Sequence, residues 1–224
     1  MFEVSERWRA AFPGAHAGVL ALRNVANPER HPVLDERKAA LVERLKARFA
    51  GQDRRAIEAL PAIRAYNAYL KPFKKTYHVQ LQLESVALKG KPIPRVAALV
   101  ECMFMAELDD QLLTAGHDLD ALGLPLKLDV AQGDESYTLM RGEAQRLKAG
   151  DMFIADGAGV ISSIVYGPDR RTRIGPDTRN VVFTVYAPAG IEAATVRAHL
   201  DGIRGHVAAI APAASIALVE VYAA

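Results

Sequence analysis

A histidine and two carboxylates follow one another closely near the middle of the chain. Residues 93–122 contain an apolar run that leads into a Gly-His-Asp stretch, where His117, Asp118 and Asp120 fall within one turn. An imidazole in a glycine-flanked turn can reach both solvent and a ligand, and it can act as acid, base or hydrogen-bond donor. The pattern makes His117 a candidate for chemistry, with Gly116, Asp118 and Asp120 as candidate substrate contacts, and an ordinary structural histidine is the alternative.

The same cluster does not predict a metal site. Its residue types can bind metals, but no second histidine lies at ligand spacing and no HExxH motif is present. Cys102 is the only cysteine, which excludes a multi-cysteine zinc site and an internal disulfide. No Walker loop or GxGxxG motif occurs, so a nucleotide-dependent kinase or dehydrogenase is disfavoured. We expect neither a metal nor a cofactor.

The element that must position this cluster is the apolar segment before it. Between Val96 and Ala106 the only charged residue is Glu101, and a helix that is hydrophobic all round belongs in a protein interior. A carboxylate in such a helix must be paired, hydrogen-bonded or protonated. We expect a central helix in which Glu101 is a structural counter-ion for an arginine, with a direct role in chemistry as the alternative.

Two serines interrupt an apolar strand pattern later in the chain. Ser162 and Ser163 lie in VISSIVY, so at least one of them should point into the sheet interior or a pocket. No GxSxG elbow surrounds them, which argues against a nucleophilic serine. We expect them to hydrogen-bond a ligand.

A basic loop follows these serines. The sequence GPDRRTRIGPD presents Arg170, Arg171 and Arg173, and Arg179 comes just beyond. Guanidinium forks suit phosphate and sugar oxygens. The loop therefore predicts RNA contacts at these four arginines, and a merely solvated loop is the alternative.

The remaining pattern places helices first and strands later. Apolar residues recur at helical spacing in the first half of the chain and again near its end. Helices are expected at residues 5–13, 35–50, 53–70 with a break at Pro61, 96–106 and 191–210. Residues 78–89 fit a helix better than a strand, although VQLQLE within them alternates like a strand. Strands are expected at residues 2–4, 17–25, 126–130 paired with 136–140, 152–155 paired with 160–166, 180–187 and 215–222. This order predicts an α+β protein with a mainly antiparallel sheet.

Composition narrows the class of protein. With 224 residues, half of them hydrophobic, the chain can bury one good core, so we expect a single domain over residues 1–224. A net charge of +2 is too mild to indicate nucleic-acid binding by itself, and we expect no DNA partner. The first residues carry charges where a signal peptide needs an apolar region, and no stretch is long enough for a membrane span. We therefore expect a cytoplasmic protein without a membrane partner.

Several motifs, taken in order, resemble a known family. The series VECMFMAELDDQLLTAGHDLDAL, GDESYTL, MFIADGAGVISSIVYG and TRNVVFTVYAP is similar to the editing module formed by the third and fourth B domains of bacterial phenylalanyl-tRNA synthetase beta subunits. Stand-alone proteins built from that module are the most similar type. The resemblance covers roughly residues 70–190 as the core, with residues 1–70 as an N-terminal helical extension. It implies a three-layer, sheet-rich fold with a central buried helix and flanking helices.

The resemblance also implies an activity. In the synthetases this module hydrolyses the ester of tRNA that carries the wrong amino acid, and the family's pocket histidine matches His117. Small residues that line the family's amino-acid pocket correspond to Ser162 and Ser163. The chain departs from the family where a Thr-Asn pair falls near Met103 and Phe104, and where a glutamate that reads a tyrosine hydroxyl falls at Thr184. These departures imply a different amino acid or lost catalysis.

Three functional hypotheses follow from the sequence. The first is a trans-acting aminoacyl-tRNA deacylase, with tRNA as partner and the aminoacyl group as small-molecule ligand. In it His117 positions the water or the terminal ribose, Ser162, Ser163 and Thr184 read the amino acid, and Phe104 borders the same pocket. The second is a non-catalytic tRNA-binding or amino-acid-sensing module. The third is a small-molecule hydrolase unrelated to RNA. The sequence does not predict the oligomeric state or a partner synthetase.

Overall fold

A four-stranded sheet forms the middle layer of the molecule. The computed structural model describes all 224 residues, and its strands run in the order β11 (Ser215–Ala223), β2 (His16–Arg23), β10 (Asn180–Ala187) and β3 (Leu113–Asp118), each antiparallel to its neighbours. The apolar runs of β2 and β10 are buried along almost their whole length, as expected for strands covered on both faces. β3 is an edge strand of this sheet.

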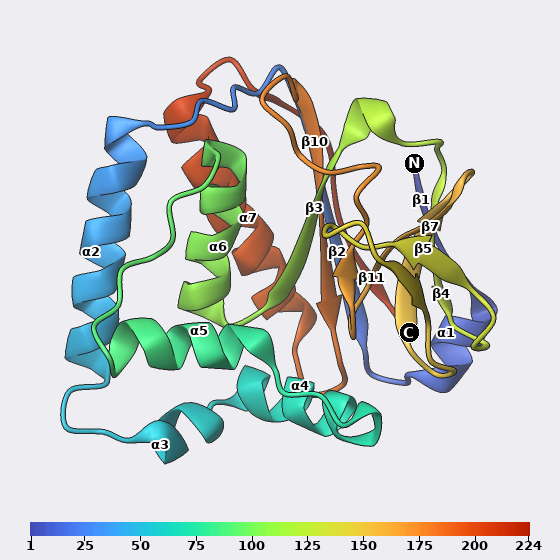
Figure 1. Cartoon of the computed structure of the whole chain (residues 1–224), viewed down its shortest axis with the longest axis horizontal. Helices are drawn as coiled ribbons and strands as arrows, with labels where there is room; N and C mark the ends of the chain where they lie inside the picture. The colour runs from blue at the N-terminus through green and yellow to red at the C-terminus, as the bar shows by residue number, and fades with distance from the viewer.

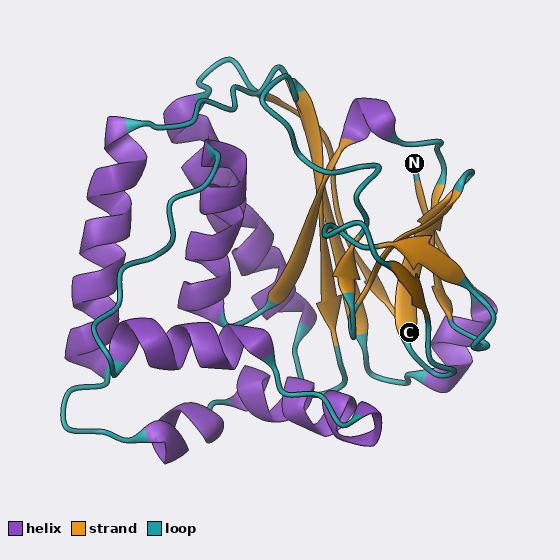
Figure 2. Cartoon of the chain, in the orientation of Figure 1, coloured by secondary structure: helices purple, strands orange, loops and turns teal.

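Helices cover one face of the sheet (Figures 1 and 2). α7 (Ala193–Ile210) packs on β2 and on α6 (Ala98–Asp110), and α2 (Pro32–Arg48) lies outside them. Gly18 permits the close approach of α7, because a Cβ atom there would lie 2.6 Å from Val196 Cγ1. α3 (Arg54–Glu58), α4 (Pro61–Leu70), a 3-10 turn (Lys71–Phe73) and α5 (His78–Ala87) complete this helical layer.

A second sheet forms the third layer on the other side. Its order is β1 (Phe2–Val4), β4 (Leu126–Val130), β7 (Met152–Asp156), β8 (Gly159–Ser163) and β9 (Gly167–Pro168), and only the β1–β4 pair is parallel. α1 (Glu6–Ala11) leads from β1 into the main sheet, with the Ser5 hydroxyl accepting the Trp8 N–H as an N-cap. β5 (Ser136–Thr138) and β6 (Ala144–Arg146) form a separate small hairpin.

The α+β class with mainly antiparallel sheets is confirmed. The helix expected at residues 78–89 is α5, which ends at Ala87, and Pro61 occupies the first turn of α4, where its missing N–H costs nothing. None of the helices is both long and apolar enough to cross a membrane.

Two local expectations were wrong. β4 does not pair with residues 136–140, because both of its edges are occupied by β1 and β7, and β5 pairs with β6 instead. His117 lies in strand β3 rather than in a turn. The strands expected at residues 2–4 and 17–25 are present as β1 and as the interior strand β2, so the N-terminal segment contributes strands as well as helices.

Glu101 is an interior polar anchor, as expected. Its Oε2 lies 2.7 Å from Lys38 Nζ and its Oε1 accepts the Val96 N–H at 3.0 Å, so the counter-ion is a lysine rather than an arginine. The neighbouring Cys102 is buried, and burial raises the pKa of its thiol to about 12. This thiol is therefore unreactive at neutral pH.

Candidate functional site

A cavity of about 470 Å³ lies along the outer edge of β3. Helices α5 and α6 form one wall, and residues 163–168 with Arg173 and Ile174 form the other. Most of the surface is apolar and comes from Val100, Met103, Phe104, Leu113, Ile164, Val165 and Ile174. This size and lining are typical of small-molecule pockets, in which a few polar groups fix the orientation of the ligand.

The most unusual polar group in this cavity is Glu107. Its side chain comes from α6 and is almost fully buried, and Oε1 accepts the N–H of Thr114 at 2.8 Å. Oε2 has no hydrogen-bond partner. Burial raises the pKa of this carboxyl to about 8, so it is mostly protonated at neutral pH. A buried carboxyl with a free oxygen can bind a ligand amine or hydroxyl.

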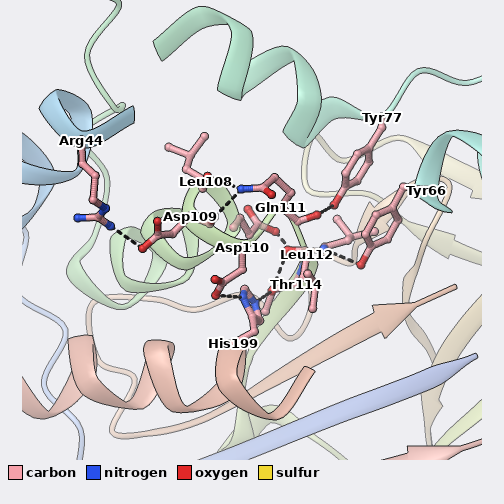
Figure 3. A network of polar contacts seen from close by, with 12 residues as sticks. Arg44, Tyr66, Tyr77, Leu108, Asp109, Asp110, Gln111, Leu112, Thr114 and His199 are labelled. Carbon is pink, nitrogen blue, oxygen red and sulfur yellow. Dashed lines mark hydrogen bonds and ion pairs between the residues drawn. The ribbon is translucent and has the colours of Figure 1, made fainter. Parts of the chain in front are cut away.

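Glu107 lies just before a tight corner between α6 and β3, and Figure 3 shows the polar contacts of Gln111, Tyr77 and Tyr66 at this corner. Gln111 makes this corner in the left-handed conformation, with φ of +61°, and its carbonyl accepts the Tyr77 hydroxyl at 2.9 Å. The Tyr66 hydroxyl accepts the N–H of Leu113 at 2.8 Å and donates to the carbonyl of Tyr186. The two tyrosine rings stack with centroids 4.2 Å apart. Buried hydrogen bonds thus fix the position of the strand edge.

His117 does not line the cavity. Its side chain is fully buried, and Nδ1 lies 2.7 Å from Thr172 Oγ1 while Nε2 has no partner. Burial, with a smaller contribution from the charge of Arg171, lowers the pKa of His117 to about 3. A bridge between His117 and Arg173 ties β3 to the segment that forms one cavity wall. The geometry therefore favours a positioning role for His117 over direct contact with substrate.

The buried imidazole predicts acid sensitivity that His117→Gln should relieve. The unfolded chain takes up a proton near pH 6.5 and the folded chain only near pH 3, so stability is lost as pH falls between these values. From pH 7 to pH 4.5 this difference costs about 2–3 kcal/mol. Urea unfolding at both pH values checks it, because the variant should lose that much less stability than the wild type. An equal loss in both proteins would contradict the prediction.

Four residues predicted from the sequence meet in the cavity. Phe104, Gly116, Ser163 and Arg173 all line it, although they come from α6, β3, β8 and the loop after β9. Gly116 leaves room for its neighbours at the cavity, since a Cβ there would lie 2.8 Å from Ile174 Cδ1 and displace that side chain.

Four other predicted residues lie outside the cavity and make structural contacts. Ser162 Oγ is 2.6 Å from the Tyr186 hydroxyl, and the hydroxyl of the buried Thr184, on β10 beside β3, lies 3.5 Å from the carbonyl of Ala115. Asp118 accepts the Thr178 hydroxyl at 2.6 Å, and Asp120 accepts the Asn180 amide at 2.8 Å.

Two of the four arginines predicted to bind RNA are engaged in contacts within the protein, and two are not. Arg171 pairs with Asp156 at 2.8 Å and also lies 3.7 Å from Asp169, and Arg179 donates to the carbonyl of Pro176. Arg170 and Arg173 are exposed and form no ion pair. Arg170 and Arg173 are thus free to bind an external anion.

Sequence reasoning missed several residues at this site. Glu107 continues the apolar run of α6, and setting the end of that run at Ala106 excluded it. Lys75 lies over the ring of Tyr166 at 5.3 Å, and Tyr166 lines the cavity. Thr114 also lines the cavity, but nothing in its sequence context distinguishes it from an ordinary strand threonine.

Known proteins resemble this chain in fold but not detectably in sequence. No family model and no curated protein matches the sequence. The structure is similar to a crystal structure of an N-terminal fragment of the phenylalanyl-tRNA synthetase beta subunit from Pyrococcus horikoshii, with a TM-score of 0.50 and 12% identity. The match covers 96% of this chain and 50% of that one, so the chain spans about half the length of the fragment. At this identity the likeness is one of fold.

Proposed function

We propose that this chain is a stand-alone deacylase that hydrolyses the ester bond of incorrectly charged tRNA. The observation that carries the proposal is the cavity at the edge of β3, which combines apolar walls, the carboxyl of Glu107 and unpaired cations nearby. An aminoacyl ester presents matching chemistry, because it has an apolar or partly polar side chain, an α-ammonium group and a neighbouring RNA phosphate chain. The fold likeness to a tRNA synthetase beta-subunit fragment supports the same direction.

Glu107 is suited to bind the α-ammonium group. The carboxyl is protonated while the cavity is empty, because burial disfavours its charge. An arriving ammonium favours the carboxylate, and the resulting pair is a charge-assisted hydrogen bond in an apolar setting. Thr114, whose N–H donates to Glu107 Oε1 at 2.8 Å, lines the same cavity, so an ammonium group on Glu107 would bring the neighbouring ester toward Thr114.

Unpaired cations near the cavity supply the contact to RNA. Four exposed basic side chains on the segments that border it form no ion pair: Lys75, Arg141, Arg170 and Arg173. Arg170 Nη1 would lie 3.1 Å from a Cβ at Gly142, so it sits beside the turn that carries Arg141. Cations in this arrangement attract phosphates, and the aminoacyl end of tRNA approaches through them.

A panel of mischarged tRNAs tests the proposal. Purified protein should release amino acid from at least one member of the panel faster than buffer alone does. An ester already activated by its ribose needs only a positioned water and donors for the developing oxyanion, so no metal needs to be added. Release no faster than buffer for every member would contradict it.

A second candidate function is binding of aminoacyl-tRNA without hydrolysis. The buried position of His117 favours it, since the imidazole expected to take part in chemistry does not reach the cavity. In that case the protein would protect the ester in the same panel rather than cleave it.

Both candidates predict that the unpaired arginines bind RNA. Replacing Arg170 and Arg173 together with alanine should weaken tRNA binding and reduce the slope of log affinity against log salt by about 1–2. Filter binding across a salt series measures both quantities. Arg204→Ala is the matched control, because Arg204 lies on α7 and pairs with Asp201 at 3.1 Å. An unchanged slope in the double variant would contradict RNA contact at this loop.

A further inference from the structure

An aspartate, a histidine and a threonine form a continuous hydrogen-bonded chain beside the cavity (Figure 3). Thr114 Oγ1 lies 2.7 Å from His199 Nε2, and His199 Nδ1 lies 3.1 Å from Asp110 Oδ2. The three residues come from β3, α7 and the last turn of α6. Three separate elements thus converge on one chain of polar contacts.

The direction of these hydrogen bonds follows from the chemistry of the groups. A carboxylate only accepts, so His199 Nδ1 carries the proton that it donates to Asp110. Nε2 of the neutral imidazole is then an acceptor, and the Thr114 hydroxyl must donate to it. The carbonyl of Leu112 lies 3.5 Å from Thr114 Oγ1, at the outer limit of a hydrogen bond, and does not compete. The lone pairs of the threonine oxygen are left free.

The two ends of this hydrogen-bonded series differ in their exposure to solvent. Thr114 lines the cavity, whereas the side chain of Asp110 is 37% exposed to solvent. His199, between them, is fully buried. This series of hydrogen bonds therefore connects the interior of the cavity with the protein surface through a single imidazole.

We infer that Thr114, His199 and Asp110 form a proton-transfer path, and that the Thr114 hydroxyl acts as the base toward the hydrolytic water. The inference rests on the proposed deacylase function and names the residues that would perform its chemistry. None of the three belongs to the set predicted from the sequence.

The step balances without any further reactant. The water gives a proton to Thr114 Oγ1 as the threonine passes its own proton to His199 Nε2, and the water oxygen bonds to the ester carbonyl carbon. Asp110 stabilises the imidazolium that forms. The bond between the carbonyl carbon and the ribose oxygen then breaks, and the ribose oxygen takes the proton back through Thr114. The products are free amino acid and uncharged tRNA.

Kinetics of Thr114 variants test the path. Thr114→Val keeps the shape but removes the hydroxyl, and it should lower the single-turnover deacylation rate by about 100-fold or more with KM unchanged. Thr114→Ser should restore the rate to within a few fold, which a merely structural role of the methyl-bearing side chain would not do. Binding of a non-hydrolysable aminoacyl amide analogue confirms that each variant is folded. A valine variant with the wild-type rate would overturn the path and leave the deacylase function intact.

Nuclear magnetic resonance of His199 provides a test that does not depend on activity. Nitrogen shifts of the labelled imidazole should show the proton on Nδ1 and not on Nε2 at neutral pH, and Thr114→Val should perturb the Nε2 signal. A proton on Nε2 would overturn the path, because Thr114 would then accept and could not pass a proton on. Failure of the wild type to deacylate any substrate would overturn the function and the path together.

Discussion

Replacing Glu107 with glutamine is expected to stabilise the protein at alkaline pH while removing its affinity for aminoacyl ligands. The carboxyl is fully buried, and burial raises its pKa to about 8 from 4.5. The folded state therefore holds a proton that the unfolded chain releases, and stability falls as pH rises from about 4.5 to 8. Glutamine resembles the protonated acid, so the variant does not lose stability as the pH rises. Above pH 8 the free energy of unfolding of the variant should exceed that of the wild type by roughly 3–5 kcal/mol, and near pH 4 the two proteins should be equally stable.

Urea unfolding at pH 4 and pH 8.5 measures the stability difference, and titration with the amide analogue measures binding. Asp151→Asn is the matched control. Asp151 is also buried, with a pKa raised to about 7, but its Oδ1 accepts the Tyr69 hydroxyl at 2.9 Å and it does not line the cavity. It should show a similar alkaline stabilisation with unchanged binding. Retained binding in Glu107→Gln would contradict the assignment of the ammonium site.

Replacing Tyr66 with phenylalanine is expected to destabilise the fold by about 2–5 kcal/mol. Its hydroxyl is buried and satisfies two backbone groups, the N–H of Leu113 at 2.8 Å and the carbonyl of Tyr186. Removing the hydroxyl leaves both without a partner, and each unsatisfied buried group costs about 1–3 kcal/mol. The change leaves the aromatic ring and its stacking in place, so packing is preserved.

Tyr77→Phe serves as the comparison for this prediction. Its ring stacks on that of Tyr66, but its hydroxyl donates to only one backbone group, the carbonyl of Gln111 at 2.9 Å. Denaturant unfolding should therefore show about half the loss seen for Tyr66→Phe. Equal losses in the two variants would indicate that ring packing, rather than the double hydrogen bond, determines stability at this corner.

Local pattern predicted most elements of this fold. Apolar periodicity located α2 and α7, the N-cap Ser5 marked the start of α1, and Pro61 marked the first turn of α4. Such signals are local because a helix or hairpin satisfies its own backbone within a short stretch. Pairing between distant strands is not local, and the expected partner of β4 was wrong because β1, more than 120 residues earlier, occupies that edge.

The candidate site was predictable only in part. Phe104, Gly116, Ser163 and Arg173 were anticipated and do meet, but the sequence did not indicate that residues 113–118 form a strand or which of them face the cavity. In a strand successive residues point to opposite faces. Treating the Gly116-His117-Asp118 stretch as a turn therefore gave His117 and Gly116 a shared surface, whereas the strand separates them. Thr114 and His199 are 85 residues apart, and only the packing of α7 on the sheet brings them together.

Mapping a bound aminoacyl analogue tests the central claim most directly, which is that the cavity at the edge of β3 receives the aminoacyl end of tRNA. Amide chemical shifts of the labelled protein would be followed during titration with an aminoacyl-adenosine amide that resists hydrolysis. The largest changes should fall on Thr114, Gly116, Ile164 and Arg173, which line the cavity. Changes confined to the separate groove that Leu81, Ser85 and Ile93 line, or no saturable change at all, would contradict the claim.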